Sequence, residues 1–437
     1  MAKLGRHHVP GLKLAYFSGE LLASIACAAV GALTAQQKAT SSLLFGGVLA
    51  SAVLASGVLH FALYLADLYD PRTTVADFRR GERILRALGG AALAVAPFTV
   101  VLPSHLRLTM TASFIAAIAG IAAFRAAVPM ASLRRRVLIA GHGAQAELVA
   151  RELDRDGEHT IVGVADPGRA DLCWQARQAK VAAVVVACDD RRGIPSQGLL
   201  RCRLAGVEVA DAPVYVEKHC RRLPVELLSP ATLIYQEGFT DSAVSAVTRR
   251  LLSACTAFAL LVVSTPLLLL IFVLIRTGSP GPALYRQERV GKDGRQFTML
   301  KFRTMREDAE RGGARWAASS DPRVTRVGAW LRRCRLDELP QLLNILAGDM
   351  NLVGPRPERP EFVSMLAEAV PYYQLRHLVR PGLTGWAQIR YPYGSSVEDA
   401  KRKLAFDLYY IKRASLLLDV VILFHTVRVV LTGRGAR

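Results

Sequence analysis

Long apolar segments dominate the N-terminal part of the chain. They lie near residues 14–34, 42–66, 86–104 and 108–129. Each approaches the roughly 20 residues that a helix needs to cross the hydrocarbon core of a bilayer. A cleaved signal peptide contains one such segment, whereas here four follow in succession. The pattern therefore predicts four transmembrane helices in residues 1–133.

Arginines in the loops predict the orientation of these helices, because cytoplasmic loops carry an excess of Lys and Arg. One group lies between the second and third segments and another follows the fourth: Arg72, Arg79, Arg80, Arg83, Arg86, Arg134, Arg135 and Arg136. The other two loops carry little beyond Lys38 and Arg107. Both ends of this four-helix unit are therefore predicted to be cytoplasmic, and so is the start of the part that follows.

A fifth apolar run covers residues 251–275. Pro266 stands within it and kinks or breaks a helix, and the hydroxyls of Ser264 and Thr265 can bond the carbonyls that are freed. Both flanks are basic, with Arg249, Arg250, Arg276, Arg286 and Arg289. A plain kinked span is the commoner structure, but these flanks favour a re-entrant helix that enters one leaflet and returns.

The middle of the chain has the pattern of an α/β domain. Residues 135–166 read as strand, glycine turn, helix and strand, and residues 181–190 supply another buried strand. Gly141 and Gly143 fit a dinucleotide-binding turn, and Asp166 follows at the distance of a ribose-binding acid. No residues for hydride transfer follow. We therefore predict a Rossmann-like domain with a vestigial or regulatory role.

Composition narrows the class of partner. Apolar residues make up 51% of the chain, and 56 Lys+Arg against 36 Asp+Glu give a formal net charge of +20. Such a balance indicates a membrane protein that faces an anionic surface or handles anionic substrates. The long apolar segments argue against nucleic acid as the partner. Seven scattered cysteines, without a Cys-x-x-Cys pair, indicate a reducing compartment rather than a disulfide framework or a zinc site.

The segment "LRRCRLDELPQLLNILAGDMNLVGPRPERPEF" (331–362) sets Asp337 and Glu338 among arginines. Leucines at helical spacing follow and Gly348 fits a helix stop, so Asp337 is expected at the helix N-cap. A helix N-terminus would keep the carboxylate ionised and attract a diphosphate. An Asp-Glu pair at a helix start is by default only a cap, whereas Arg356, held between two prolines, points to phosphate binding.

From Arg249 onward, the chain resembles the bacterial sugar transferase family, the polyprenyl-phosphate glycosyl-1-phosphate transferases. Five blocks carry the resemblance: "SPGPALYRQERVG" (279–291), "FTMLKFRTM" (297–305), "LDELPQLLNIL" (336–346), "GDMNLVGPRPERPEFV" (348–363) and "RPGLTGWAQI" (380–389). The upstream parts look like those of the large, polytopic-anchored members. The segment 223–239 is similar to one in exopolysaccharide-associated members.

The resemblance implies the reaction and the roles of several residues. Members move a sugar-1-phosphate from a UDP-sugar to undecaprenyl phosphate at the cytoplasmic leaflet, release UMP and use Mg²⁺. It implies Asp337 as the nucleophile that forms a phosphosugar intermediate and Glu338 as the Mg²⁺ ligand. Phosphate or nucleotide contacts are implied for Lys301, Arg303, Arg332, Arg356 and Arg380. Trp386 is as readily a core residue as a base-stacking one.

This chain departs from the family pattern at two places. The start of the fifth run usually reads basic-basic-x-x-Asp, but here Ser253 replaces the acid, which puts the expected polar tether in doubt. Thr265 separates Ser264 from Pro266, where a Ser-Pro pair is usual. Near the C-terminus, residues 397–413 fit an amphipathic helix at the lipid headgroups and residues 415–431 fit an interfacial helix.

We thus expect a membrane α plus α/β protein with three parts. These are a four-helix transmembrane bundle (1–133), a Rossmann-like domain (134–245), and a re-entrant helix with a mainly helical α/β catalytic domain (246–437). The expected location is the bacterial inner membrane, with both domains facing the cytoplasm, and a homo-oligomer is left open.

Two alternatives remain. One is a membrane-anchored nucleotide sensor with an inert transferase-like part. The other is a transporter, disfavoured because Glu20 and His60 are isolated among spans that lack paired charges.

Overall fold

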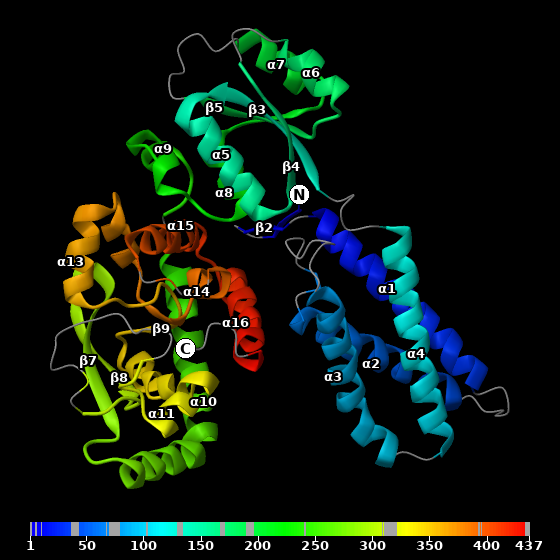
Figure 1. Ribbon diagram of the computed structural model, residues 1–437, viewed down its shortest axis with the longest axis vertical. Coiled ribbons are helices and arrows are strands. Elements are labelled where there is room, and N and C mark those ends of the chain that lie inside the picture. Colours follow the sequence, from blue (N-terminus) through cyan, green and yellow to red (C-terminus); the bar gives the residue numbers. More distant parts are fainter. Residues whose placement is uncertain are drawn as a thin grey trace. The chain divides into compact units, whose positions relative to one another are not determined.

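A computed structural model describes residues 2–4, 7–9, 11–35, 43–66, 68–69, 79–101, 104–128, 134–166, 171–188, 196–239, 242–307, 309, 321–391, 394 and 396–432. From Val9 onward, two compact units divide the chain between Ala212 and Pro213 (Figure 1). The described residues are mostly helical, with one small parallel sheet and several apolar helices. Two short strands, β1 (Ala2–Leu4) and β2 (His7–Val9), pair near the N-terminus. Arg72 and Lys38, which support the predicted orientation, lie outside the described residues.

The first unit begins with four helices: α1 (Gly11–Ala35), α2 (Leu43–Leu65), α3 (Arg79–Val101) and α4 (Ser104–Ala127). Small apolar residues form the core between them, among them Ala28, Ala52, Ala91 and Ala117. Helices α1 and α4 approach closely at Gly31, because a Cβ there would lie 2.8 Å from the carbonyl oxygen of Ala112. Small side chains thus set the packing distance in this bundle.

Within the described residues, three helices are long and apolar enough to cross a membrane, over Ala15–Thr34, Arg107–Ala127 and Ala243–Gly278. The first two match the first and fourth spans that the sequence predicts. Shorter apolar helical stretches, Ala50–Leu65 and Ala87–Ala96, lie within the second and third predicted spans. A transmembrane anchor of four helices therefore stays a prediction.

A buried ion pair joins α1 to α4, so the expectation of spans without paired charges is wrong. The Nε of Arg125 lies 2.5 Å from a carboxylate oxygen of Glu20, which is fully buried. The guanidinium of Arg125 also lies over the Tyr69 ring, and the His60 ring stacks with the Tyr69 ring, with centroids 6.3 Å apart. The sequence hides the pair because 105 residues separate its members. Its position near the end of α4 favours a structural role over a transport pathway.

A four-stranded parallel sheet follows in the first unit. It contains β3 (Arg135–His142), β4 (His159–Ala165), β5 (Ala183–Cys188) and β6 (Glu208–Asp211), in the order β4-β3-β5-β6. The helices between and after these strands in the first unit are α5 (Gly143–Asp156), α6 (Leu172–Gln178) and α7 (Ser196–Leu204), and α8 (Ala212–Cys220) begins at the boundary between the units. The predicted strands and glycine turn are confirmed. The strand order is the second common order of doubly wound sheets, not the one that dinucleotide-binding Rossmann domains use.

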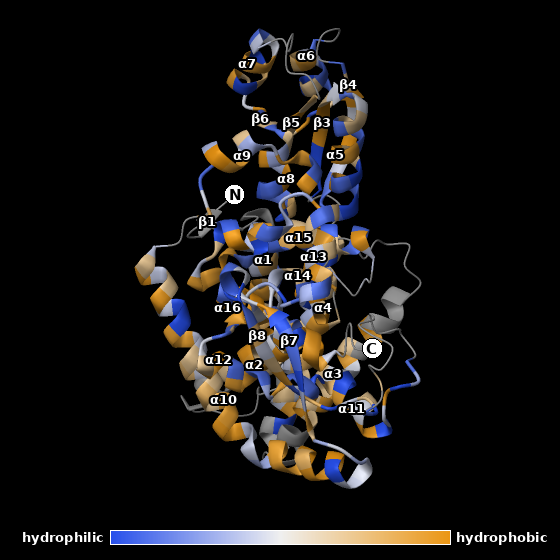
Figure 2. Ribbon diagram, turned by 90° about the vertical axis from the view of Figure 1, so that its left-hand side faces the viewer, coloured by the Kyte–Doolittle hydropathy of each residue, from blue (hydrophilic) through white to orange (hydrophobic). Residues whose placement is uncertain are grey.

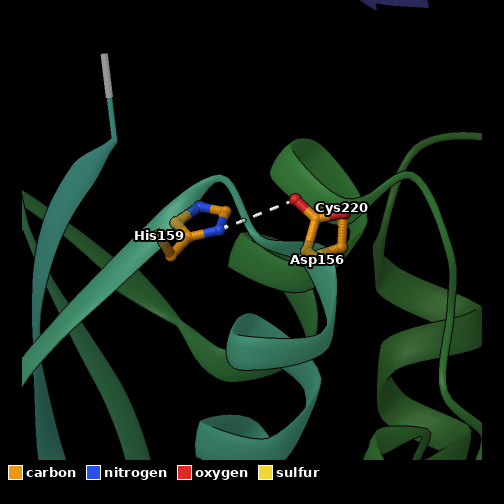
Figure 3. A group of neighbouring side chains, drawn as sticks. All are labelled: Asp156, His159 and Cys220. Carbon is orange, nitrogen blue, oxygen red and sulfur yellow. Dashed lines mark ion pairs between the residues drawn. The ribbon is translucent and has the colours of Figure 1, made fainter. Parts of the chain in front are cut away.

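Two glycines of this sheet have structural roles that require no ligand. A Cβ on Gly141 would lie 1.9 Å from the carbonyl oxygen of Ala187, so glycine lets β3 and β5 approach. After α5, Gly157 has a φ of 68° and turns the chain into β4. His159 and Asp156 face each other across this turn, with Nδ1 and a carboxylate oxygen 3.6 Å apart (Figure 3).

The second unit contains a hairpin, a short parallel strand pair and many helices. Its elements after α8 are η2 (Val225–Leu227), α9 (Pro230–Tyr235), α10 (Ala243–Gly278), β7 (Leu284–Val290), η3 (Lys292–Gly294), β8 (Gln296–Phe302), α11 (Arg326–Cys334), η4 (Leu336–Glu338), α12 (Gln341–Ala347), β9 (Asn351–Val353), α13 (Pro360–Ala369), η5 (Tyr373–Leu378), β10 (Gly382–Thr384), α14 (Trp386–Arg390), α15 (Val397–Arg413) and α16 (Leu416–Leu431). Strands β7 and β8 pair antiparallel, and β9 and β10 pair parallel. Trp386 is a core residue: it is 1% exposed and donates from Nε1 to the carbonyl of Arg221.

Helix α10 bears the predicted Pro266 and changes direction along its length (Figure 1). The hydroxyls of Ser264 and Thr265 donate to carbonyls one turn earlier, as the sequence predicts. A straight helix of 36 residues would be about 54 Å long. Yet both end regions of α10 pack against other elements of the second unit. Arg250 donates to the carbonyl of Ile345 at 2.6 Å, and Ile275 packs in a cluster with Leu331. The side chains in between are mostly apolar and many are exposed (Figure 2).

The start of α10 makes polar contacts although Ser253 stands where the family pattern has an acid. Ser253 accepts a hydrogen bond from the amide of Leu352 at 3.4 Å. Arg249 instead reaches α16, where its Nη1 lies 3.8 Å from a carboxylate oxygen of Asp419. The hydroxyl of Tyr410 donates to Asp419 at 2.9 Å. An acid from another helix thus pairs with the base at the start of α10.

Helix α15 has the bounds that the sequence predicts, but its expected place at the headgroups is wrong. Its second half, from Leu404 to Lys412, is buried in the core. Lys412 is held inside by a 2.6 Å ion pair with Glu217. The burial of this half on every side outweighs the amphipathic pattern. Helix α16 exposes apolar side chains, among them Val420, Phe424 and Val427, so its interfacial role stays a prediction.

Candidate active site

Asp337 and Glu338 lie in the tight turn η4, between α11 and α12. Arg335 enters the turn with a φ of 60°, and the amide of Leu339 donates to the carbonyl of Leu336 at 3.3 Å. Helix α12 begins only at Gln341. The expectation that Asp337 is its N-cap is therefore wrong. The residue three positions on is Pro340, which has no N–H to donate to the carboxylate. The predicted stop at Gly348 is confirmed, with a φ of 103°.

The two acids have different partners. Glu338 accepts a hydrogen bond from Nη2 of Arg356 at 2.6 Å, in an ion pair that is mostly buried on the glutamate side. Asp337 is also buried, and within the described residues no hydrogen bond reaches its carboxylate. Because no hydrogen bond engages it in the described residues, the Asp337 carboxylate is the one that can attack an electrophile.

Opposite pKa shifts accompany these environments. Burial, and then the adjacent charge of Glu338, raise the pKa of Asp337 to about 6. Burial acts in the same direction on Glu338, but the Arg356 guanidinium outweighs it and lowers the pKa of Glu338. A pair whose pKa values are pushed apart is suited to two different roles.

Two more cations lie near the pair. Lys301 of β8 has its Nζ 4.9 Å from the Tyr285 ring centroid, and its positive charge favours the ionised form of Asp337. Burial, followed by Arg289 and Arg356, lowers the pKa of Lys301 to about 8. Arg332 of α11 donates from Nε to the hydroxyl of Thr304 at 2.9 Å and also favours the ionised Asp337. The structure thus brings Lys301, Arg332 and Arg356 to the acid pair.

Two predicted phosphate ligands lie elsewhere. Arg303 donates to the carbonyls of Ser279 and Pro280 and to the hydroxyl of Ser279, so it fastens the loop after α10. Arg380 donates to the carbonyl of Gly348 at 3.0 Å, at the end of α12 opposite to the acid pair. With seven residues, α12 sets these two ends about 10 Å apart.

The remaining predicted residues belong to other elements. Gly141 lies near the end of β3, Gly143 begins α5 with a φ of 75°, and Asp166 is exposed directly after β4. These three lie in the first unit. Ser264 and Pro266 lie in the middle of α10.

A cavity of about 550 Å³ adjoins the site. Its charged lining residues are Arg335, Glu338, Arg356, Glu358, Arg376, Lys403 and Asp407. Its apolar lining includes Leu260 of α10 and five residues of α16, namely Leu423, Val427, Val429, Val430 and Leu431. The cavity therefore offers a charged region beside the acids and an apolar surface for a long hydrocarbon.

Sequence reasoning missed the buried pair Arg376 and Asp407. The guanidinium of Arg376 lies 3.1 Å from a carboxylate oxygen of Asp407, and both side chains are less than 10% exposed. The sequence held one signal: Asp407 is the single charged residue in the otherwise apolar run "LAFDLYYI" (404–411).

The donor set of the acid pair fits Mg²⁺. This ion binds through one or two carboxylates together with substrate phosphates and water. Asp337 and Glu338 supply adjacent carboxylates, and Arg356 occupies one oxygen of Glu338. The other oxygen of Glu338 is the atom that would hold the ion.

Paired carboxylates beside cations are typical of sites that handle phosphate groups. Residues 244–433 match the sequence profile of a family described as bacterial sugar transferase. A UDP-N-acetylgalactosamine-undecaprenyl-phosphate N-acetylgalactosaminephosphotransferase of Aeromonas hydrophila is 42% identical over 249 residues, 57% of this chain and 58% of that protein. An undecaprenyl-phosphate glucose phosphotransferase of Komagataeibacter xylinus is 36% identical over 323 residues, 70% of this chain and 60% of that protein.

An exopolysaccharide production protein of Rhizobium leguminosarum bv. phaseoli is 42% identical over 199 residues, 43% of this chain and 98% of that protein. The chain belongs to the bacterial sugar transferase family. It spans 58% and 60% of the length of the Aeromonas and Komagataeibacter proteins.

Proposed function

We propose that this protein transfers a sugar-1-phosphate from a UDP-sugar to undecaprenyl phosphate, releases UMP, and thereby initiates exopolysaccharide synthesis. One observation carries the proposal. Asp337 and Glu338, with opposed pKa shifts, lie among three cations beside a cavity whose lining is partly charged and partly apolar. The names of the relatives agree with this substrate class.

Transfer proceeds in two displacements. A carboxylate oxygen of Asp337 attacks the phosphorus next to the sugar, and the bond from that phosphorus to UMP breaks. A phosphate oxygen of undecaprenyl phosphate then attacks the same phosphorus. The bond to Asp337 breaks, so that the carboxylate is restored and the lipid diphosphate sugar departs. With a pKa of about 6, roughly 90% of Asp337 is ionised at pH 7.

The cations offset the negative charge of the donor diphosphate, which would otherwise repel the attacking carboxylate. Lys301 and Arg332 lie where their charge acts on Asp337, and Arg356 orients Glu338. Mg²⁺, when bound at Glu338, supplies further charge neutralisation at the phosphates.

The apolar lining from α10 and α16 supports a lipid acceptor presented at a membrane surface. In this proposal, α10 breaks at Pro266 and re-enters the cytoplasmic leaflet, four helices anchor the chain in the inner membrane, and the doubly wound Rossmann-like domain stays cytoplasmic. A sensor with an inert transferase part is disfavoured, because the acids, cations and cavity are all in place.

Turnover tests the proposal directly. The full chain in lipid nanodiscs is mixed with undecaprenyl phosphate, Mg²⁺ and a panel of UDP-sugars, and UMP release is measured. We expect continued UMP release from at least one donor only when the lipid is present, because without an acceptor each protein can release at most one UMP. Folded protein that releases no UMP with any donor would contradict the proposal.

A further inference from the structure

The loop that carries Arg356 is held through its carbonyl oxygens. Two prolines flank Arg356, so neither neighbour has an N–H, and carbonyls are the backbone groups left to fix the loop. Four consecutive carbonyls accept hydrogen bonds from four residues in three segments: Pro355 from the Gly382 amide (2.9 Å), Arg356 from Nη2 of Arg376 (2.8 Å), Pro357 from Nη1 of Arg289 (2.9 Å) and Glu358 from the Val290 amide (3.0 Å).

Arg376 fixes the carbonyl of Arg356 itself. It lies in η5 and is 7% exposed. Its Nη2 donates both to this carbonyl and to Asp407 of α15, and its Nη1 donates to the hydroxyl of Tyr373 at 2.5 Å. The guanidinium is therefore locked by three acceptors from three segments, and its rigid planar form suits such a fixed task.

A chain of contacts runs from this buried pair to the acid pair. Asp407 holds Arg376, Arg376 holds the backbone of Arg356, and the Arg356 guanidinium meets Glu338 at 2.6 Å. Arg376 and Asp407 line the same cavity. Neither touches Asp337 or Glu338 in the described structure.

We propose that Arg376 and Asp407 are positioning residues for the transfer reaction, which aim Arg356 at Glu338 by fixing its backbone carbonyl. The proposal rests on the proposed function. Stability alone is a weak reason to keep this pair, because well-packed apolar residues often replace a buried ion pair at no loss. Burial, opposed by Arg376, raises the pKa of Asp407 to about 6, so the buried site disfavours the ionised carboxylate. A role in holding Arg376 explains why an acid stands there. Glu358 and Lys403 are the other charged groups that act on Asp407.

The test removes the contact while keeping the fold. A double variant, Arg376→Met with Asp407→Leu, deletes both buried charges and keeps the volume approximately. Arg376→Lys keeps a charge, but a lysine ammonium cannot present a planar fork to the three acceptors. The control is Glu398→Gln, an acid-to-amide change at an exposed site on α15.

We expect kcat to fall about 10- to 30-fold in both Arg376 variants, no more than the loss of the Arg356 contact itself would cause, with little change in the KM for undecaprenyl phosphate. In an Arg356→Gln background, Arg376→Lys should cost little more, because the contact that Arg376 positions is already gone. Glu398→Gln should behave as the wild type. A folded double variant with wild-type kcat, or an Arg376→Lys loss that is as large in the Arg356→Gln background as in the wild type, would overturn the proposal.

Wild-type UMP release tests the proposed function separately, so the two failures are distinguishable.

Discussion

Replacing Arg356 by glutamine should weaken catalysis and move its pH dependence. The substitution removes the 2.6 Å hydrogen bond to Glu338 and leaves that carboxylate buried without its cation. Arg356 also lowers the pKa of Asp337, so both acids should bind protons more readily in the variant.

The structure sets the size of this effect. A hydrogen bond to a charged group contributes about 1.5–3 kcal/mol, which corresponds to about 10- to 150-fold in rate if it acts in the transition state. The Arg356 side chain is 35% exposed, and partial solvation weakens the contact. We therefore expect the lower part of this range, about a 10- to 30-fold loss of kcat/KM at pH 8.

The assay measures UMP release between pH 5 and pH 9. In the wild type, kcat/KM should fall as the pH drops through about 6, because the Asp337 carboxylate must be ionised to attack. In Arg356→Gln this fall should begin at higher pH. Arg326→Gln, an exposed arginine-to-amide change on α11, is the control and should match the wild type. An Arg356→Gln profile with an unmoved acidic limb would refute the electrostatic reasoning.

Three further results are expected. Glu338→Gln should weaken the Mg²⁺ dependence of turnover, and an unchanged metal titration would remove Glu338 as a ligand. Single cysteines beside Arg249 and Arg276 should both react with a reagent added from the cytoplasmic side, whereas labelling from opposite sides would show that α10 spans the membrane. Leu342→Ala in the fully buried face of α12 should cost about 2–5 kcal/mol in the free energy of unfolding, and a loss below 1 kcal/mol by denaturant titration would contradict its place in the core.

Local patterns in the sequence predicted much of the fold. The bounds of α15, the strand β5 and the stop at Gly348 follow from periodicity and from glycine conformation, which neighbouring residues determine. The acid pair and Arg356 were found through a contiguous segment of the chain.

Contacts between distant residues were not predictable in this way. Arg376 and Asp407 are 31 residues apart, and Glu20 and Arg125 are 105 apart, so no local spacing reveals either pair. The N-cap expectation failed for another reason. Leucine spacing predicted the apolar face of α12 but not its first residue. The helix begins after Pro340, at Gln341.

Intact-protein mass measurement tests the central claim most directly. The wild type and Asp337→Asn are each incubated with Mg²⁺ and an accepted UDP-sugar, without undecaprenyl phosphate. We predict that the wild type releases up to one UMP per protein and gains the mass of one sugar phosphate, mapped to Asp337, whereas Asp337→Asn does neither. UMP release by Asp337→Asn at the wild-type rate, or a modification on another residue, would contradict Asp337 as the nucleophile.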